Sequence, residues 1–119
     1  MDEKKEFYRL ELEDGTLVAE HVVPATTPWM RFCGLMFRRE LPEGHGICLR
    51  PCSSIHMFFM RFPIDVAFVD RDGNVVHVLN AIKPWRMSKM VFKSAAAIEL
   101  PAGTLAARGV IKGSAIRMV

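Results

Sequence analysis

Apolar and polar positions alternate with a period of two in residues 7–12, and short apolar stretches recur along the rest of the chain, a pattern that predicts short β-strands. A hairpin is expected over residues 7–23, because alternating residues flank Asp14-Gly15, a strong hairpin-turn signal. From residue 46 onward, short apolar stretches are separated by proline and glycine. We expect further strands at residues 46–50, 55–60, 64–69, 75–80, 91–92, 95–100 and 115–119.

One short helix is predicted near residues 28–36. Thr27 is a favoured N-cap residue, and Pro28 suits the first helical position. A single helical turn is expected again at residues 104–108. Strands at this spacing, with little helix, indicate a β-dominated α+β fold. We expect one compact domain over residues 1–119, built as a partly closed barrel or rolled sheet.

The same alternation predicts the core. Side chains on the apolar side of a predicted strand should be buried against the rest of the sheet. Segment 55–60 is apolar on both faces, which favours a central strand that is covered on both sides. The expected core residues are Leu10, Val18, Val66, Phe68, Val76, Val78, Ile98 and Leu100.

Composition and charge narrow the class of protein. The chain has 119 residues and is 50% hydrophobic, which fits a folded single domain. Residues 1–20 hold seven acidic and three basic residues, which leaves six acidic and thirteen basic residues for the rest. This basic body favours an anionic partner. Because the basic residues are scattered along the sequence, without a basic run or an aromatic stacking platform, we predict no nucleic-acid partner.

The expected location is the cytoplasm, without a membrane partner. The first residues are charged and lack the apolar core of a secretory leader. No clean apolar run reaches the ~20 residues that a membrane-spanning helix needs. Cys33, Cys48 and Cys52 are expected to be free thiols. Cys48, Cys52 and His56 could hold a metal only if a turn brought them together, so we expect no metal and no cofactor.

The candidate site lies in the apolar central part of the sequence. His56, Arg61 and Asp65 need partners there, because an unpaired charge in an apolar interior is costly. We expect Arg61 and Asp65 to form an ion pair across the turn between them. Arg86, on a loop beside Trp85, offers a guanidinium fork for a carboxylate or phosphate. The hypothesis is that His56, Arg61, Asp65 and Arg86 face one concavity and bind a ligand.

Each of these residues also has a purely structural interpretation. Arg61 and Asp65 could form an ion pair that only fixes the turn. His56 could be a core histidine held by a backbone carbonyl. Glu99 is a carboxylate in an apolar stretch and could pair with Arg31, Arg61 or Arg86, and the sequence does not choose between them.

Several ordered blocks resemble one protein family. Arg31 to Arg38 reads RFCGLMFR and resembles the family block R-x-x-G-L-M-x-R. Further resemblances lie at residues 55–66, 83–86, 99–103 and 109–113. The family is the uncharacterised prokaryotic group called domain of unknown function 192, and the resemblance covers about residues 16–119. It implies a compact, β-rich single domain and no activity, since the family has no established one. Ser114 stands where the family usually has Asp, and Met57 replaces a residue that is often Thr.

Three classes of function are compatible with the sequence. The favoured one is a non-catalytic binding module for a small anionic ligand or a protein partner. The second is a small enzyme that uses His56 and Asp65 as an acid–base pair. The third is a purely structural or interaction domain. Enzyme sites usually place a nucleophile or a metal beside the base, whereas here only Cys52 and Ser54 lie near His56 in the sequence, without an activating context.

Overall fold

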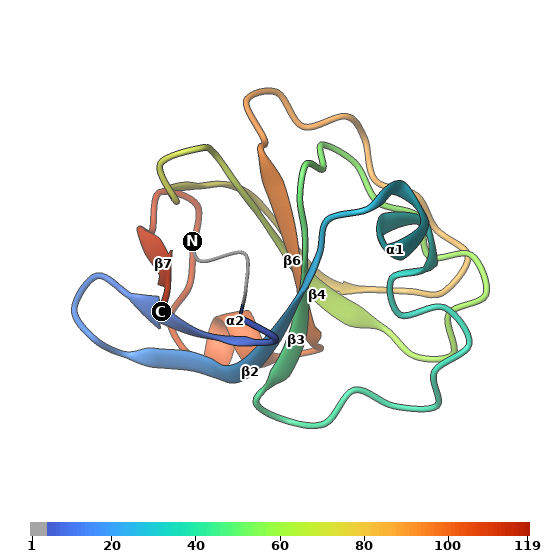
Figure 1. Ribbon diagram of the computed structural model, residues 1–119, viewed down its shortest axis with the longest axis horizontal. Helices are drawn as coiled ribbons and strands as arrows, with labels where there is room; N and C mark the ends of the chain where they lie inside the picture. The colour runs from blue at the N-terminus through green and yellow to red at the C-terminus, as the bar shows by residue number, and fades with distance from the viewer. Residues whose placement is uncertain (1–4) are drawn as a thin grey trace.

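Seven strands form one curled sheet in the computed structural model, which describes residues 5–119 (Figure 1). The order across the sheet is β5-β4-β6-β3-β2-β1-β7. Neighbouring strands are antiparallel, except for the parallel pair β2 and β3. The elements are β1 (Tyr8–Leu12), β2 (Leu17–Ala25), α1 (Pro28–Cys33), β3 (His45–Leu49), β4 (Ile64–Val69), β5 (Val75–Ile82), β6 (Ala96–Pro101), α2 (Thr104–Ala107) and β7 (Ile116–Met118).

The two outermost strands, β5 and β7, are joined at one end of the sheet. Asn74, just before β5, forms a β-bridge with Ala115, just before β7. The N–H of Ile116 also donates to the carbonyl of Gly73 at 2.8 Å. Joining the outer strands of a twisted sheet curls it toward a barrel. The fold is therefore a compact, partly closed barrel, which confirms the predicted fold class.

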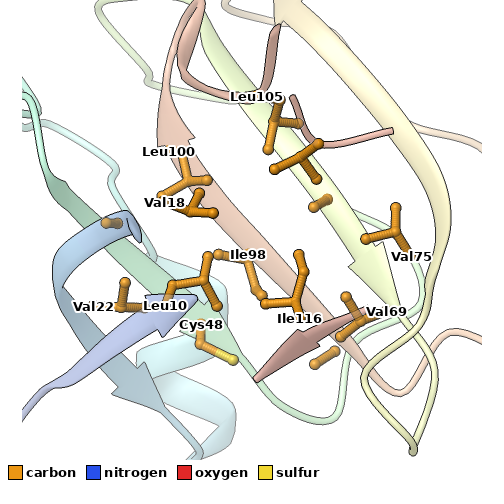
Figure 2. Close-up of a cluster of buried hydrophobic side chains, with 14 residues drawn as sticks. Leu10, Val18, Val22, Cys48, Val69, Val75, Ile98, Leu100, Leu105 and Ile116 are labelled. Carbon is orange, nitrogen blue, oxygen red and sulfur yellow. The ribbon is translucent and has the colours of Figure 1, made fainter. Parts of the chain in front are cut away.

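Apolar side chains fill both faces of the curled sheet. In β4, Ala67 and Val69 belong to one buried cluster, whereas Val66 and Phe68 belong to the other. This follows from the two-residue period of a strand. We call the face of Ala67 and Val69 the inner face, because its cluster gathers side chains from all seven strands (Figure 2). The outer face, that of Val66 and Phe68, is covered by loops on the α1 side of the sheet, which contribute Leu35, Ile55, Met57, Met60 and Val91 to its cluster (Figure 1).

Most of the predicted core residues are buried. Val76 and Val78 are half-buried instead, and they pack against the outer and the inner cluster respectively. The remaining six residues are all buried: Leu10, Val18, Val66, Phe68, Ile98 and Leu100.

Segment 55–60 is not the central strand that its composition predicts. His56 makes an isolated bridge with Met87, and the rest of the segment is loop. Its apolar side chains serve as a cover, since Met57 and Met60 are buried in the outer cluster. The expected strand at residues 91–92 is also a loop. In both cases the prediction rested on apolar composition. A loop that packs over a sheet can be as apolar as a strand within the sheet, so composition does not distinguish the two.

The helices are short and match their capping signals. The hydroxyl of Thr27 accepts a hydrogen bond from the N–H of Met30 at 3.1 Å, as an N-cap does. Helix α1 ends at Gly34, which has φ +46°, so it is shorter than predicted. The helical turn expected at residues 104–108 is present as α2, a helix of four residues, so the fold has two short helices in its described part. In residues 5–119 no helix has the length and apolar character required to span a bilayer.

Candidate functional site

A small cavity lies on the outer face, between α1, the loop after β3 and strand β6. Its volume is about 50 Å³, enough for a few water molecules. An open pocket of about 500 Å³ adjoins it and shares Arg31, Phe32, Cys52 and Ser54 as lining residues. We call the two spaces the Glu99 cavity and the adjoining pocket. The polar or titratable side chains that line the Glu99 cavity are Arg31, Cys33, Cys52, Ser54, His56 and Glu99.

Glu99 reaches the cavity from the middle of β6. Its neighbours Ile98 and Leu100 face the inner cluster, so the strand period turns Glu99 to the outer face. The residue is only 5% exposed, and its carboxyl group has no hydrogen-bond or ion-pair partner within residues 5–119. Burial raises the pKa of Glu99 to about 8. The group is therefore mainly protonated and uncharged at neutral pH, and the expected pairing with an arginine is not formed.

Arg31 brings a permanent positive charge to the same place. One terminal nitrogen, Nη1, donates to the carbonyl of Pro51 at 3.1 Å, which fixes the side chain against the loop after β3. The Nε atom is buried and finds no acceptor in the described part of the chain. A buried donor without an acceptor is energetically unfavourable. Arg31 and Glu99 thus both carry unsatisfied polar atoms, and both line the cavity.

His56 connects the central loop to α1 through both ring nitrogens. Its Nδ1 accepts from the N–H of Phe58 at 3.2 Å. An acceptor Nδ1 belongs to the neutral ring that carries its proton on Nε2, and Nε2 lies 3.1 Å from the carbonyl of Phe32. The network therefore assigns a neutral imidazole that is held by backbone groups. This geometry matches the structural interpretation of His56 and leaves neither nitrogen free to act as a base.

Burial makes two of the three thiols unreactive, those of Cys48 and Cys52, whereas Cys33 lines the cavity and is half-buried. Cys52 donates its S–H to the carbonyl of Ser54 at 3.0 Å, and burial raises the pKa of this thiol. Cys48 is buried in the inner cluster, so Cys48, Cys52 and His56 do not converge as a metal site would need. Within residues 5–119 no group of three or more His, Cys, Asp or Glu side chains could hold a metal ion. All three cysteines are free.

The predicted ion pair between Arg61 and Asp65 is not formed. Asp65 is fully buried, and its carboxylate accepts three backbone N–H groups, those of Ala81 at 2.8 Å and of Gly103 and Leu105 at 3.0 Å. Asp65 shares its strand face with Ala67, so it turns toward α2, whereas Arg61 precedes the strand and is exposed. Strand geometry thus separates the two charges.

Asp65 and His56 also lie on opposite faces of the sheet. His56 lines the cavity of the outer face, and Asp65 binds the start of α2 on the inner face. The acid–base pair of the enzyme hypothesis is therefore absent from this geometry. Arg86 is exposed and is not among the residues that line the cavity. Of the four residues predicted to share one concavity, only His56 lines the Glu99 cavity.

The sequence named Arg31 only as one of three possible partners of Glu99, and it singled out Glu99 without placing it. The signal for Glu99 was present in the strand alternation, which sets it on the face of Ala97 rather than that of Ile98. For Arg31, the first family-like block, residues 31–38, was the available pointer.

Comparison with known proteins gives the chain a family. The model of the DUF192 family, described as an uncharacterized ACR, matches residues 9–118. The chain belongs to this family. A UPF0127 protein of Pyrococcus furiosus is 36% identical over 88 residues, which cover 70% of this chain and 73% of that protein. Neither description names an activity.

Two solved structures share the fold of this DUF192 protein. A protein of unknown function from Novosphingobium aromaticivorans superposes with a TM-score of 0.81 at 22% identity, covering 93% of this chain and 83% of the other. A Sinorhizobium meliloti protein, described as a proposed transcription regulator, has a TM-score of 0.77 at 25% identity, with 97% of each chain covered. These likenesses support the single β-rich domain.

Proposed function

We propose that this protein is a non-catalytic binding module whose ligand is a small organic anion, with a carboxylate or a group of similar size entering the Glu99 cavity. The observation that carries the proposal is that Arg31 and Glu99 line one cavity, each with polar atoms that no described residue satisfies. A ligand that pairs with both groups would remove the energetic cost of leaving them unpaired.

Electrostatics favours an anion over a cation. At neutral pH the carboxyl of Glu99 is mainly protonated because of its raised pKa, and both ring nitrogens of His56 contact backbone groups. Among the polar side chains that line the cavity, Arg31 then supplies the full charge, and it is positive. A ligand carboxylate can accept from the guanidinium of Arg31 and from the protonated carboxyl of Glu99.

The sizes of the two spaces fit a ligand with a small charged head. The Glu99 cavity, at about 50 Å³, suits a single carboxylate-sized group. The adjoining pocket, at about 500 Å³, lies within the range of small-molecule sites and is open to solvent. The exposed ring of Phe32 gives this pocket an apolar wall. A short organic acid with an apolar or polar tail is therefore the ligand class that we propose.

Binding is favoured over catalysis by the state of the nearby groups. Cys52 has a raised pKa and donates its proton to a backbone carbonyl, so it lacks the activation of a nucleophile. His56 has no nitrogen free to accept a proton. The free thiols also support the cytoplasm as the proposed location, since thiols stay reduced there. The regulatory role proposed for the Sinorhizobium meliloti protein would fit a module that senses a small anion.

Thermal-shift measurements with acetate, pyruvate, succinate and inorganic phosphate at millimolar concentration test the proposal. At least one carboxylate should raise the Tm, because a ligand that binds only the native state stabilises it. Arg31→Met keeps much of the side chain and removes the charge, so it should abolish that rise. Arg38→Met is the matched control, since Arg38 is exposed and does not line the cavity. If no anion raises the Tm, or if Arg31→Met responds as the wild type does, the proposal is wrong.

A further inference from the structure

Three segments without any acidic residue come together around α1. Residues 28–39, 50–62 and 83–94 hold nine of the 16 Lys and Arg residues of the chain and none of its 13 Asp and Glu residues. The N–H of Phe37 donates to the carbonyl of Phe59 at 3.0 Å, which joins the first two segments. The N–H of Trp85 donates to the carbonyl of Met57 at 2.8 Å, which joins the last two. We call this surface the aromatic–basic face; it lies on the α1 side of the sheet (Figure 1).

The face carries a continuous row of ring contacts. Successive ring centroids lie between 4.9 and 6.2 Å apart. Trp29 is 73% exposed and Trp85 is 59% exposed. So many exposed rings in contact form an apolar patch of the kind that marks a binding surface. The row runs Trp29, Phe32, His56, Phe58, Trp85, Phe59, Phe37.

Backbone strain holds three of these rings in place. Phe37, Phe59 and Trp85 have φ values of +66°, +61° and +69°, in the left-handed region that bulky residues rarely adopt. A bulky residue in this region destabilises the fold relative to the same residue in ordinary backbone. Their rings are nevertheless exposed, so burial does not offset that cost. Glycine or asparagine would suit folding better at these positions, which points to a role for the rings outside the fold.

We propose that the aromatic–basic face binds single-stranded nucleic acid without marked sequence preference. Exposed rings stack on bases, and Lys and Arg beside them contact the phosphates. Among the described cations, Arg61 and Arg86 are exposed and flank the ring row in sequence. The absence of acidic side chains from the three segments removes repulsion of the phosphates. A polynucleotide alternates flat bases with negative charges, so it matches a face that offers both rings and cations.

The prediction of no nucleic-acid partner rested on the absence of a basic run and of an aromatic platform in the sequence. The fold changes that premise, because backbone hydrogen bonds bring the three segments, and the rings that they carry, together. The face adjoins the small-anion site and shares Arg31, Phe32 and His56 with it, so the test uses residues that the two sites do not share. Arg61, Phe59, Arg86 and Trp85 are not among the residues that line the Glu99 cavity.

Intrinsic fluorescence reports on the face directly, because both tryptophans of the chain, Trp29 and Trp85, lie in it. The probe is an oligothymidylate of about twenty nucleotides, which covers more than one typical site. Titration should quench the emission, and the affinity should fall steeply with salt. Arg61→Gln together with Arg86→Gln should weaken binding about tenfold or more. Arg71→Gln together with Arg108→Gln, exposed cations outside the three segments, should leave it unchanged.

Two further variants separate binding from folding. Asparagine tolerates the left-handed region, so Phe59→Asn and Trp85→Asn should keep or raise the Tm. Both should weaken oligothymidylate binding about tenfold or more. Phe7→Asn is the matched control, since Phe7 is an exposed aromatic residue outside the face. It should leave the affinity unchanged.

Three outcomes would overturn the proposal. The first is no quenching at about 100 μM oligonucleotide and ~150 mM salt. The second is binding that both Phe59→Asn and Trp85→Asn leave intact. The third is a shift of the tryptophan emission by poly-glutamate, or by vesicles of phosphatidylcholine and phosphatidylglycerol, without any response to the oligonucleotide. That last result would assign the face to an acidic polypeptide or to an anionic lipid surface.

Discussion

The carboxylate of Asp65 accepts a hydrogen bond of 3.0 Å from the N–H of Leu105, forty residues further along the chain. The same carboxylate accepts from Gly103 at 3.0 Å and from Ala81 at 2.8 Å. A single buried side chain thus ties β4 to the end of β5 and to the start of α2. No cation takes part in this contact within the described residues.

Asp65→Asn should lower the free energy of unfolding by about 3 kcal/mol. Hydrogen bonds to a charged acceptor contribute about 1.5–3 kcal/mol each, and an amide turns two hydrogens toward groups that are themselves donors. Urea denaturation of the two proteins measures the difference. Asp72→Asn is the control, because Asp72 is exposed and should change stability little. A loss below about 1 kcal/mol for Asp65→Asn would contradict this account.

Phe68→Ala should destabilise the protein by about 3–5 kcal/mol, because the ring is fully buried in the outer cluster and its removal leaves a cavity. The same truncation at Phe92, an exposed ring, should cost far less. Both values come from denaturant unfolding at one pH. Equal losses for the two variants would mean that the outer cluster is not a packed core.

Alanine substitutions at Gly73 and Gly15 distinguish the effect of backbone strain from that of a steric collision. Both have a left-handed backbone, with φ values of +88° and +90°. A Cβ atom at position 15 meets nothing within 4 Å, whereas one at position 73 collides with the carbonyl oxygen of Ile116. That carbonyl belongs to the junction that closes the barrel.

Gly15→Ala should therefore cost about 1–2 kcal/mol, the price of strain alone. Gly73→Ala should cost about 1–3 kcal/mol more, because the backbone at the closure must also move. Thermal and urea unfolding of the two variants give the comparison. Equal decreases in the free energy of unfolding would show that the backbone at the junction between Gly73 and Ile116 moves at little energetic cost.

The strands could be predicted where the signal lies within a short segment of the sequence. Asp14-Gly15 marks the first hairpin, and the apolar run of residues 64–69, interrupted only by Asp65, marks a strand that is buried throughout. The segments that cover the outer face were not predictable in the same way. Residues 55–60 and 84–88 bond mainly to each other, and their pairing depends on chain folding rather than on either sequence alone.

The candidate site also combines features that the local sequence predicts with features that depend on contacts between distant segments. The sequence correctly indicates that Asp65 needs buried partners, but it favours a guanidinium four residues away over backbone N–H groups that the fold supplies from a distance. The aromatic–basic face also could not be predicted from the order of residues along the chain. Its cations lie in three separate segments of the sequence, and those segments are joined by hydrogen bonds only in the folded chain.

The buried carboxyl of Glu99 predicts how stability changes with pH. Its pKa rises from 4.5 to about 8 on folding, because burial disfavours the charged form. Below the lower value both states are protonated, so the contribution of Glu99 to stability is fully present. Between the two values the unfolded chain has released the proton and the native chain still holds it. The free energy of unfolding therefore falls by about 1.4 kcal/mol per pH unit from this group, until the native state also ionises near pH 8.

Glu99→Gln tests this directly, because an amide resembles the protonated carboxyl and does not titrate. The variant and the wild type should have similar stability near pH 4.5, and the variant should become more stable by several kcal/mol as the pH rises through about 8. Urea unfolding at intervals across this range gives both curves. Glu40→Gln, at an exposed position, should run parallel to the wild type. If Glu99→Gln also runs parallel to the wild type, then Glu99 is ionised in the native protein, and the proton that the proposed carboxylate ligand would share is not there.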